Sequence, residues 1–468
     1  MIKHLLFILS LLSVPAMAWP GDTILVSGVF PGAGGQEIRL MAPKDMFSPQ
    51  SREIVSAIAD EDGHFSFSFT ADRTRQYALR VMQFSNTLYA GPGNDLKLSF
   101  DTIDLASSSR NPYPLLQPYP MKVRNRNQGQ PDLNELSHEL HLMVADFLEA
   151  EVAQNVRANH RPALHAFSSR LDSAYRDVDH PFFQAYIRYF MAYLHSSLHA
   201  TPVGELIQLY LLDQPVLYDH PLYADFFKSV MDNYIFSGSR SLRLWELQNL
   251  VNGEADYHGL MEYLERDPLL ADDRMRELVM TRSLQNMLNR RGFDPGQVLK
   301  VLQQTAASGR HAEHRQMAGR ILDHQLSLRP GSRAPSFSLA DAAGGELVLD
   351  DFLGQYVYLF FGSMACPVSM GEIGALMDLA EGLGDQLMVV GILTDHDPEG
   401  IGELHGRNAD NAVFLHFGGD YRLLDRYRLR TIPYFVLIGP QGEIIGKPFL
   451  APTAGAEAAI KEVISGSG

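Results

Sequence analysis

The sequence predicts a multidomain protein with a small N-terminal β-sandwich, an all-α middle region and a C-terminal α/β domain. Three changes along the chain support that prediction. Short strand-like runs separated by turns fill residues 23–100, and His64–Phe69 alternates polar and aromatic residues with the period of a strand. Residues 132–326 follow the helical period instead. From residue 356 onward, strand-like and helix-like segments alternate, as they do in α/β domains.

The predicted boundaries begin with a secretory leader. Lys3 provides its positive charge, Leu5–Leu12 its apolar stretch, and Ala16-Met17-Ala18 a cleavage site of the small-x-small type. We expect cleavage after Ala18, a periplasmic location and no membrane span. The expected segments are a leader at 1–18, a β-sandwich-like domain at 19–105, a linker at 106–130, a helical domain at 131–328 and the α/β domain at 329–468.

Composition excludes several classes of partner. The formal net charge is −16, and the isoelectric point is near 5.5. Nucleic acids and anionic membrane surfaces attract basic proteins, so neither is expected to bind here. The chain has a single cysteine, Cys366, and therefore cannot form an internal disulfide even though export usually favours them. A lone thiol in an oxidising compartment is reactive, so Cys366 is the first candidate for function.

The C-terminal region predicts a sheet whose parallel strands come first and whose hairpin comes last. The hairpin is indicated by the turn Gly439-Pro440-Gln441-Gly442. The expected strands are 356–361, 387–393, 413–416, 434–438 and 443–446, and the expected helices are 368–383, 399–406, 421–427 and 453–465.

Cys366 follows a buried strand and a short turn, and it opens a helix. Ser369 stands where a Cys-x-x-Cys motif would have its second cysteine. Three further parts of the sequence match the pattern of a known family. They are Ala334–Leu339 followed by Leu347–Phe352, then Glu372, and finally Thr431-Ile432-Pro433. On these residues, positions 330–466 resemble the thioredoxin-like domains of exported thiol-disulfide oxidoreductases related to TlpA and ResA. The order of the three regions also resembles multidomain members found in Bacteroidetes.

The resemblance implies a set of site residues. Cys366, Ser369 and Glu372 take the catalytic positions. Thr431, Ile432 and Pro433 take the substrate-binding loop, in which the family has a cis-proline facing the motif.

Three departures from the family pattern limit the chemistry. Ser369 replaces the resolving cysteine, Ala365 replaces the usual tryptophan, and Phe360 replaces a buried aspartate of thioredoxin itself. Because only a thiolate can resolve a mixed disulfide, a two-cysteine cycle within this chain is impossible.

The remaining chemistry is that of a single thiol. A helix N-terminus favours the thiolate form, to which Ser369 could donate a hydrogen bond. The leading hypothesis is a monothiol oxidoreductase relative whose partners are protein thiols and disulfides or another envelope protein, and which needs no cofactor. The alternative is a redox-inactive binding or scaffold protein, in which Cys366 is a small half-buried hydrophobe and Glu372 is a solvated carboxylate of the first helical turn. A one-cysteine peroxidase is a third hypothesis: Ser363 offers a hydroxyl at the right offset, but Leu359 replaces the required proline.

Histidine pairs raise the question of a metal site. His138 and His141 are three residues apart, as are His311 and His314, each with a glutamate between them. Neither pair has a recognisable third ligand, so we interpret both as surface histidines of helices and predict no metal site. Asp395, with His396 and Asp397 before Pro398, is interpreted as a helix-capping loop.

Overall fold

The computed structural model describes residues 22–466 except 49, 102–118, 127–131, 154–158, 254–255, 341–344, 396–400, 402–403 and 405–410. The predicted leader at 1–18, most of the predicted linker at 106–130 and most of the expected helix at 399–406 lie outside the described residues. No helix in the described ranges is long and apolar enough to cross a membrane.

The N-terminal region consists of two sheets, with strand orders β4-β1-β7-β9 and β3-β2-β5-β6-β8. Their inner faces share one hydrophobic cluster, to which Ile24 and Leu98 contribute from one sheet and Leu40 and Leu79 from the other. The predicted β-rich region is confirmed. The strands are β1 (Thr23–Val29), β2 (Glu37–Pro43), β3 (Ser51–Ile58), β4 (His64–Thr70), β5 (Arg75–Val81), β6 (Phe84–Ala90), β7 (Asp95–Phe100), β8 (Tyr119–Pro120) and β9 (Val123–Asn125).

The middle region is helical, as predicted. The Asp294 side chain caps α9 by accepting from the backbone N–H of Gly296 at 2.7 Å, and Pro295 occupies the first turn. The helices are α1 (Leu133–Phe147), η2 (Leu148–Val152), α2 (Arg161–Ala174), α3 (Pro181–Ser197), α4 (Val203–Tyr210), α5 (Pro221–Met231), η3 (Tyr234–Gly238), α6 (Leu244–Asn252), α7 (Tyr257–Leu264), η4 (Pro268–Leu270), α8 (Asp273–Met287), α9 (Pro295–Ser308) and α10 (Ala312–Leu326).

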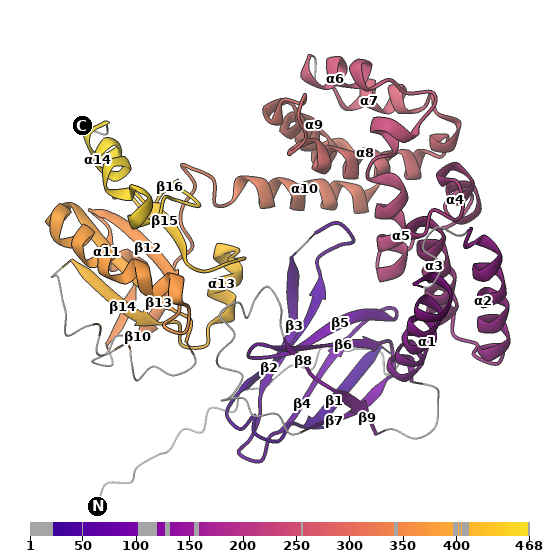
Figure 1. Cartoon of the computed structure of the whole chain (residues 1–468), viewed down its shortest axis with the longest axis horizontal. Helices are drawn as coiled ribbons and strands as arrows, with labels where there is room; N and C mark the ends of the chain where they lie inside the picture. Colours follow the sequence, from indigo (N-terminus) through magenta and orange to yellow (C-terminus); the bar gives the residue numbers. More distant parts are fainter. Residues whose placement is uncertain are drawn as a thin grey trace, which may run out of the picture.

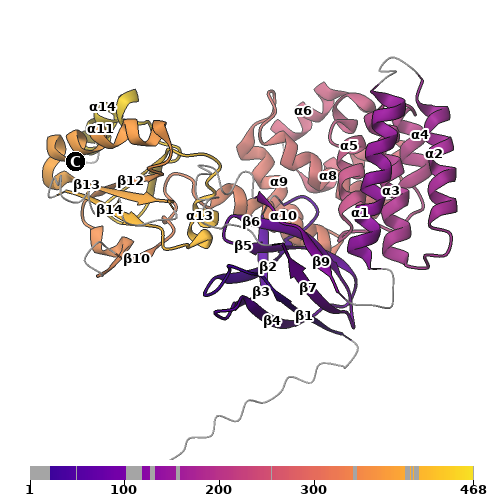
Figure 2. The same cartoon turned by 60° about the horizontal axis from the view of Figure 1, so that its bottom comes forward.

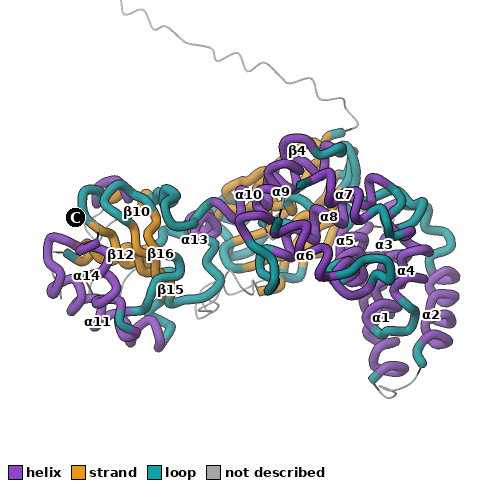
Figure 3. The backbone as a smooth tube through the Cα atoms, turned by 90° about the horizontal axis from the view of Figure 1, so that it is seen from above, coloured by secondary structure: helices purple, strands orange, loops and turns teal. Residues whose placement is uncertain are grey.

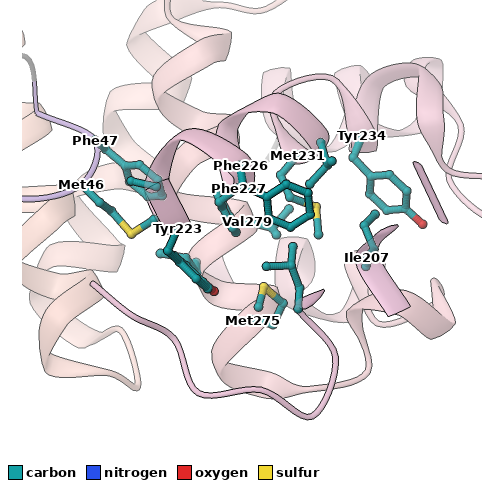
Figure 4. Close-up of a cluster of buried hydrophobic side chains, with 14 of the residues drawn as sticks. Met46, Phe47, Ile207, Tyr223, Phe226, Phe227, Met231, Tyr234, Met275 and Val279 are labelled. Atoms are coloured by element: carbon teal, nitrogen blue, oxygen red, sulfur yellow. The ribbon is translucent and has the colours of Figure 1, made fainter. Parts of the chain in front are cut away.

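The β-region and the helical region share a core. Met46 and Phe47, in the loop after β2, insert between helices and lie in the same cluster as Tyr223, Phe227 and Met275 (Figure 4). The rings of Phe47 and Phe227 are 5.7 Å apart. Burying two large apolar side chains of one region inside another stabilises their contact by about 1.5–3 kcal/mol each.

The C-terminal region is an α/β domain built on a five-stranded sheet of order β14-β13-β12-β15-β16. β12 pairs parallel with β13 and antiparallel with β15, and β15 and β16 form the final hairpin. The predicted order of strands is therefore confirmed. The elements are β10 (Ser338–Ala340), β11 (Glu346–Val348), η5 (Leu349–Phe352), β12 (Tyr356–Gly362), α11 (Pro367–Leu383), η6 (Gly384–Gln386), β13 (Leu387–Leu393), β14 (Ala412–His416), α13 (Tyr421–Tyr427), β15 (Tyr434–Ile438), β16 (Ile444–Gly446), η7 (Pro452–Ala454) and α14 (Ala456–Gly466).

The two faces of this sheet have separate cores because side chains alternate along a strand. Tyr358 and Phe360 of β12 pack in one cluster with side chains of α11 and α14. Leu359 and Phe361 pack in the other, with side chains of α13. Cys366 belongs to this second cluster, which we call the α13-side core.

The β-region lies beside α10 in the middle of the molecule (Figure 1). The C-terminal domain lies at one end and helices α2 and α4 lie at the other (Figures 1 and 3). Helix α10 leads from the helical region towards the C-terminal domain, and α13 lies beside the end of α10 and the β-region (Figures 1 and 2).

Candidate functional site

The loop between β12 and α11 places Cys366 immediately before the first residue of a helix. Cys366 is the N-cap residue of α11, with an extended backbone (φ −95°, ψ 113°), and Pro367 follows in the first turn. The backbone N–H of Cys366 donates to the carbonyl of Ser363 at 3.1 Å, and its own carbonyl accepts from Met370 N at 3.0 Å. Proline suits this position because the N–H it lacks has no partner at a helix start. The predicted strand, turn and helix therefore all form.

The thiol of Cys366 lies below the surface. The residue is 2% exposed and belongs to the α13-side core, together with Ile432 and Leu423. In contrast, Val368 is 61% exposed and Met370 is 42% exposed on the first turn of the same helix. The motif therefore presents apolar side chains to solvent while its sulfur is covered.

Ser369 and Glu372 are both buried, but neither side chain has a hydrogen bond to the thiol. Ser369 Oγ has no hydrogen-bond partner among the described residues, including the sulfur of Cys366. The Glu372 carboxylate accepts from Thr453 N at 3.1 Å and from Thr453 Oγ at 2.5 Å. It therefore joins α11 to η7 and is not the solvated carboxylate of the alternative interpretation.

The loop before β15 supplies the predicted substrate-binding residues. The Ile432–Pro433 peptide bond is cis. Ile432 is buried in the α13-side core with Cys366, whereas Pro433 is half-buried and Thr431 is exposed. The structure thus brings Cys366 and Ile432 into one cluster and leaves part of the loop open to a partner.

Asp395 supports the motif loop, a role that the sequence analysis missed. Its carboxylate accepts from Ser363 Oγ at 2.8 Å, Met364 N at 2.7 Å and Ala365 N at 3.2 Å. Its carbonyl accepts from His416 Nε2 at 2.7 Å, taking that nitrogen as the protonated one. The sequence position of Asp395 could have indicated this role. Asp395 closely follows β13, the parallel neighbour of β12, so both strands end at the same edge of the sheet, next to the motif loop.

The interpretation of both histidine pairs as surface residues is wrong for His314. His138 and His141 are exposed, but His314 is fully buried and its Nδ1 lies 2.8 Å from Glu277 Oε2. Glu277 also accepts from Tyr257 and from the backbone of Arg310 and His311. Burial raises the pKa of Glu277, but the hydrogen bond with His314 and these further hydrogen bonds lower it to about 2. Within the described ranges, no group of three or more His, Cys, Asp or Glu side chains is arranged to hold a metal ion.

Comparisons with known proteins address the C-terminal region. Residues 330–446 match the model of the AhpC/TSA family. Similar solved structures include the thioredoxin domain of a thiol-disulfide oxidoreductase from Bacteroides vulgatus, which is 26% identical over 29% of this chain and 99% of that chain, with a TM-score of 0.27. A thiol:disulfide interchange protein from a Bacteroides species is 25% identical over 30% of this chain and 92% of its own, with a TM-score of 0.27.

A thioredoxin-like protein from Bacteroides caccae matches over a longer stretch, with 17% identity over 55% of this chain and 95% of its own and a TM-score of 0.32. The comparison with curated proteins gave no match.

Proposed function

We propose that this chain, whose residues 330–446 form a thioredoxin-fold domain of the AhpC/TSA family, exchanges thiols with partner disulfides through Cys366 alone. The observation that carries the proposal is the placement of the single cysteine at the N-cap of α11, in the strand–turn–helix position of a redox motif. Residues 1–18 predict a secretory leader, so we assign this activity to the cell envelope.

The exchange proceeds in one step on this chain. The Cys366 thiolate attacks one sulfur of a partner disulfide, the S–S bond of the partner breaks, and a mixed disulfide forms. The second sulfur leaves as a thiolate and takes up a proton. Because residue 369 is serine, release of Cys366 requires an external thiol, which attacks the mixed disulfide and becomes disulfide-bonded to the partner in its place.

Docking of a partner is supported by the surface around the covered thiol. Val368 and Met370 expose apolar area beside Cys366. A partner chain that covers these side chains and Pro433 gains contact area while the first turn of α11 opens to expose the sulfur.

The burial of Cys366 favours a second candidate, a redox-inactive docking domain. A thiol that is 2% exposed cannot meet a disulfide unless the loop moves. In this candidate the same surface binds partners without any covalent step.

One experiment separates the two candidates. The folded full chain is incubated with a disulfide-bonded peptide and analysed by intact mass, with Cys366→Ala as the control. Thiol exchange predicts a mixed disulfide on the folded protein and none on the variant. If Cys366 forms the adduct only in denaturant, the result contradicts thiol exchange by the folded protein and supports the redox-inactive docking domain.

The peroxidase hypothesis has less support at the motif. Ser363 Oγ donates its proton to Asp395 at 2.8 Å, so its hydroxyl is not directed as a donor towards a peroxide at Cys366. We therefore do not propose peroxide reduction.

A further inference from the structure

A large cavity lies where the β-region, the end of α10 and the C-terminal domain meet. Its volume is about 990 Å³. Eight arginine or lysine residues line it, against three aspartate or glutamate residues. The whole chain has a formal charge of −16, so positive charge gathers at this junction against the overall balance of the protein.

Several of the lining arginines have structural partners, and two of them join the C-terminal domain to the other regions. Arg422, on α13, donates to the carboxylates of Glu37 and Glu53 at 2.7–3.0 Å. Arg428 donates to the carbonyl of His324 and to Ser327 Oγ, at the end of α10. These two side chains hold the three regions together, and no ligand is needed to explain them.

Arg39 has no such partner. It is 4% exposed, and its guanidinium donates no hydrogen bond to any described residue. The guanidinium lies 5.6 Å from the centre of the Tyr421 ring. Burial, followed by the nearby Arg422, lowers the pKa of Arg39, whereas Asp425 and Glu37 act in the opposite direction. A guanidinium that is largely removed from water and makes no hydrogen bond is costly, so an anion in the cavity would stabilise Arg39.

The neighbours of Arg39 increase this cost. Arg80 is its direct cross-strand partner in the pairing of β2 with β5, and like charges in that arrangement destabilise a sheet. Arg80 Nε is buried without a hydrogen bond in the described part of the chain, and its Nη1 lies 3.9 Å from Asp425. Burial, together with Arg428 and Arg430, lowers the pKa of His324 to about 4. The cavity is therefore strongly positive.

We propose that this cavity binds a small molecule that carries at least two phosphate or carboxylate groups, held by Arg39, Arg80 and Arg430. Arg430 is exposed at the cavity and has no hydrogen bond or ion pair with a described residue. The planar fork of a guanidinium matches the oxygens of either anionic group. The volume is at the upper end of the range for small-molecule sites. This site is independent of Cys366 and its chemistry.

Titration calorimetry on the full chain tests the proposal, with tripolyphosphate as one probe and citrate as the other. A titration with sodium chloride at the same ionic strength is the control, because it distinguishes binding at a specific site from general screening of charge by salt. We expect saturable binding of one anion per chain. The probe that binds with the higher affinity shows whether the natural ligand carries phosphate or carboxylate groups.

Three variants locate the binding. Arg430→Ala and Arg39→Met should each weaken binding at least about tenfold, the loss expected for a charge-assisted hydrogen bond. Arg39→Met should not lower the thermal midpoint of the ligand-free protein, because it removes an unpaired buried charge. Arg291→Ala, at an exposed arginine of the helical region, should bind as the native protein does.

Three results would overturn the proposal. The first is the absence of saturable binding of either probe at matched ionic strength. The second is affinity that Arg430→Ala and Arg39→Met leave unchanged. The third is binding of a polyglutamate peptide with no binding of either small anion, which would assign the cavity to an acidic protein partner.

Discussion

Asp395 is the residue that holds the motif loop in place. One carboxylate accepts hydrogen bonds from Ser363, Met364 and Ala365, the three residues immediately before Cys366. The position of the sulfur therefore depends on a side chain from the neighbouring strand end.

Asp395→Asn should loosen this loop. An amide offers one acceptor oxygen and turns an NH₂ group towards the donors, so we expect a loss of about 1–3 kcal/mol in the free energy of unfolding. We also expect Cys366 to react faster with iodoacetamide, because the loop opens more often. Asp385→Asn, at an exposed position of η6, is the matched control and should change neither value. Equal reactivity of Cys366 in both variants would contradict this role.

Among individual residues, the sequence predicted those whose position is set by local structure. Cys366 at the start of a helix and the loop of Pro433 follow from the strand and turn pattern around them. The partners of Asp395 and Glu372 come from other elements, and a single sequence carries no signal for those contacts.

Helices α8 and α10 are joined by a buried polar network. Glu277 of α8 lies 2.8 Å from His314 of α10, whose other ring nitrogen lies 2.8 Å from the hydroxyl of Tyr218. Burial is the main cause that lowers the pKa of His314. The network is therefore consistent with a neutral imidazole that donates to a charged Glu277 and accepts from Tyr218.

Glu277→Gln should destabilise the helical region by about 2–4 kcal/mol in chemical unfolding, because its NH₂ group would face several donors inside the core. Glu313→Gln is the matched control on α10. That glutamate is half-exposed and pairs with Arg274 at 3.4 Å, so its loss should cost less than about 1 kcal/mol. Equal effects of the two substitutions would contradict the network.

The same network predicts a pH dependence. The folded-state pKa of Glu277 is about 2, below the ordinary 4.5, so its contribution is present above pH 4.5 and is lost as pH falls towards 2. His314 also has a lowered pKa, so the unfolded chain takes up its proton first as pH falls below 6.5. Thermal midpoints measured from pH 7 to pH 3 should fall in the native protein. The part of that fall below pH 4.5 should be smaller in Glu277→Gln, and parallel curves there would refute this assignment.

Elements with strong periodicity could be predicted, whereas polar or half-exposed ones could not. The strands at β12, β13 and β15 are continuous apolar runs and match the prediction closely. β3 (Ser51–Ile58) carries no such signal, because it lies at a sheet edge and has no buried residue. In β6 (Phe84–Ala90) polar residues interrupt the apolar pattern and weaken the signal. One of them, Asn86, donates to the carbonyl of Met121 at 2.6 Å.

At the scale of the whole molecule, contacts between residues distant in sequence join the three regions. Arg422 of α13 binds Glu37 of β2 and Glu53 of β3, and Arg320 of α10 donates to Asp45 at 3.1 Å. Composition and periodicity predict the regions, but these pairs depend on how the folded regions meet.

Arg422→Ala should loosen the contact between the C-terminal domain and the β-region. The ion pairs are half-exposed, so we expect a change in stability of no more than about 1 kcal/mol, but a larger radius of gyration in X-ray scattering and faster proteolysis near residues 328–335. Arg426→Ala is the matched control, since Arg426 pairs at 3.3 Å with Asp420 of its own domain. Scattering curves that coincide for native and Arg422→Ala proteins would show that this contact does not hold the domains.

The most direct test of the central claim, that Cys366 exchanges thiols but cannot resolve the product, is the stoichiometry of thiopyridone release from dithiodipyridine. The folded native chain should release one equivalent and keep a stable mixed disulfide by intact mass. Ser369→Cys should release a second equivalent, lose the adduct and form an internal disulfide, because residue 369 then supplies the attacking thiolate. No release from the folded native chain, or an adduct that persists in Ser369→Cys, would contradict the claim.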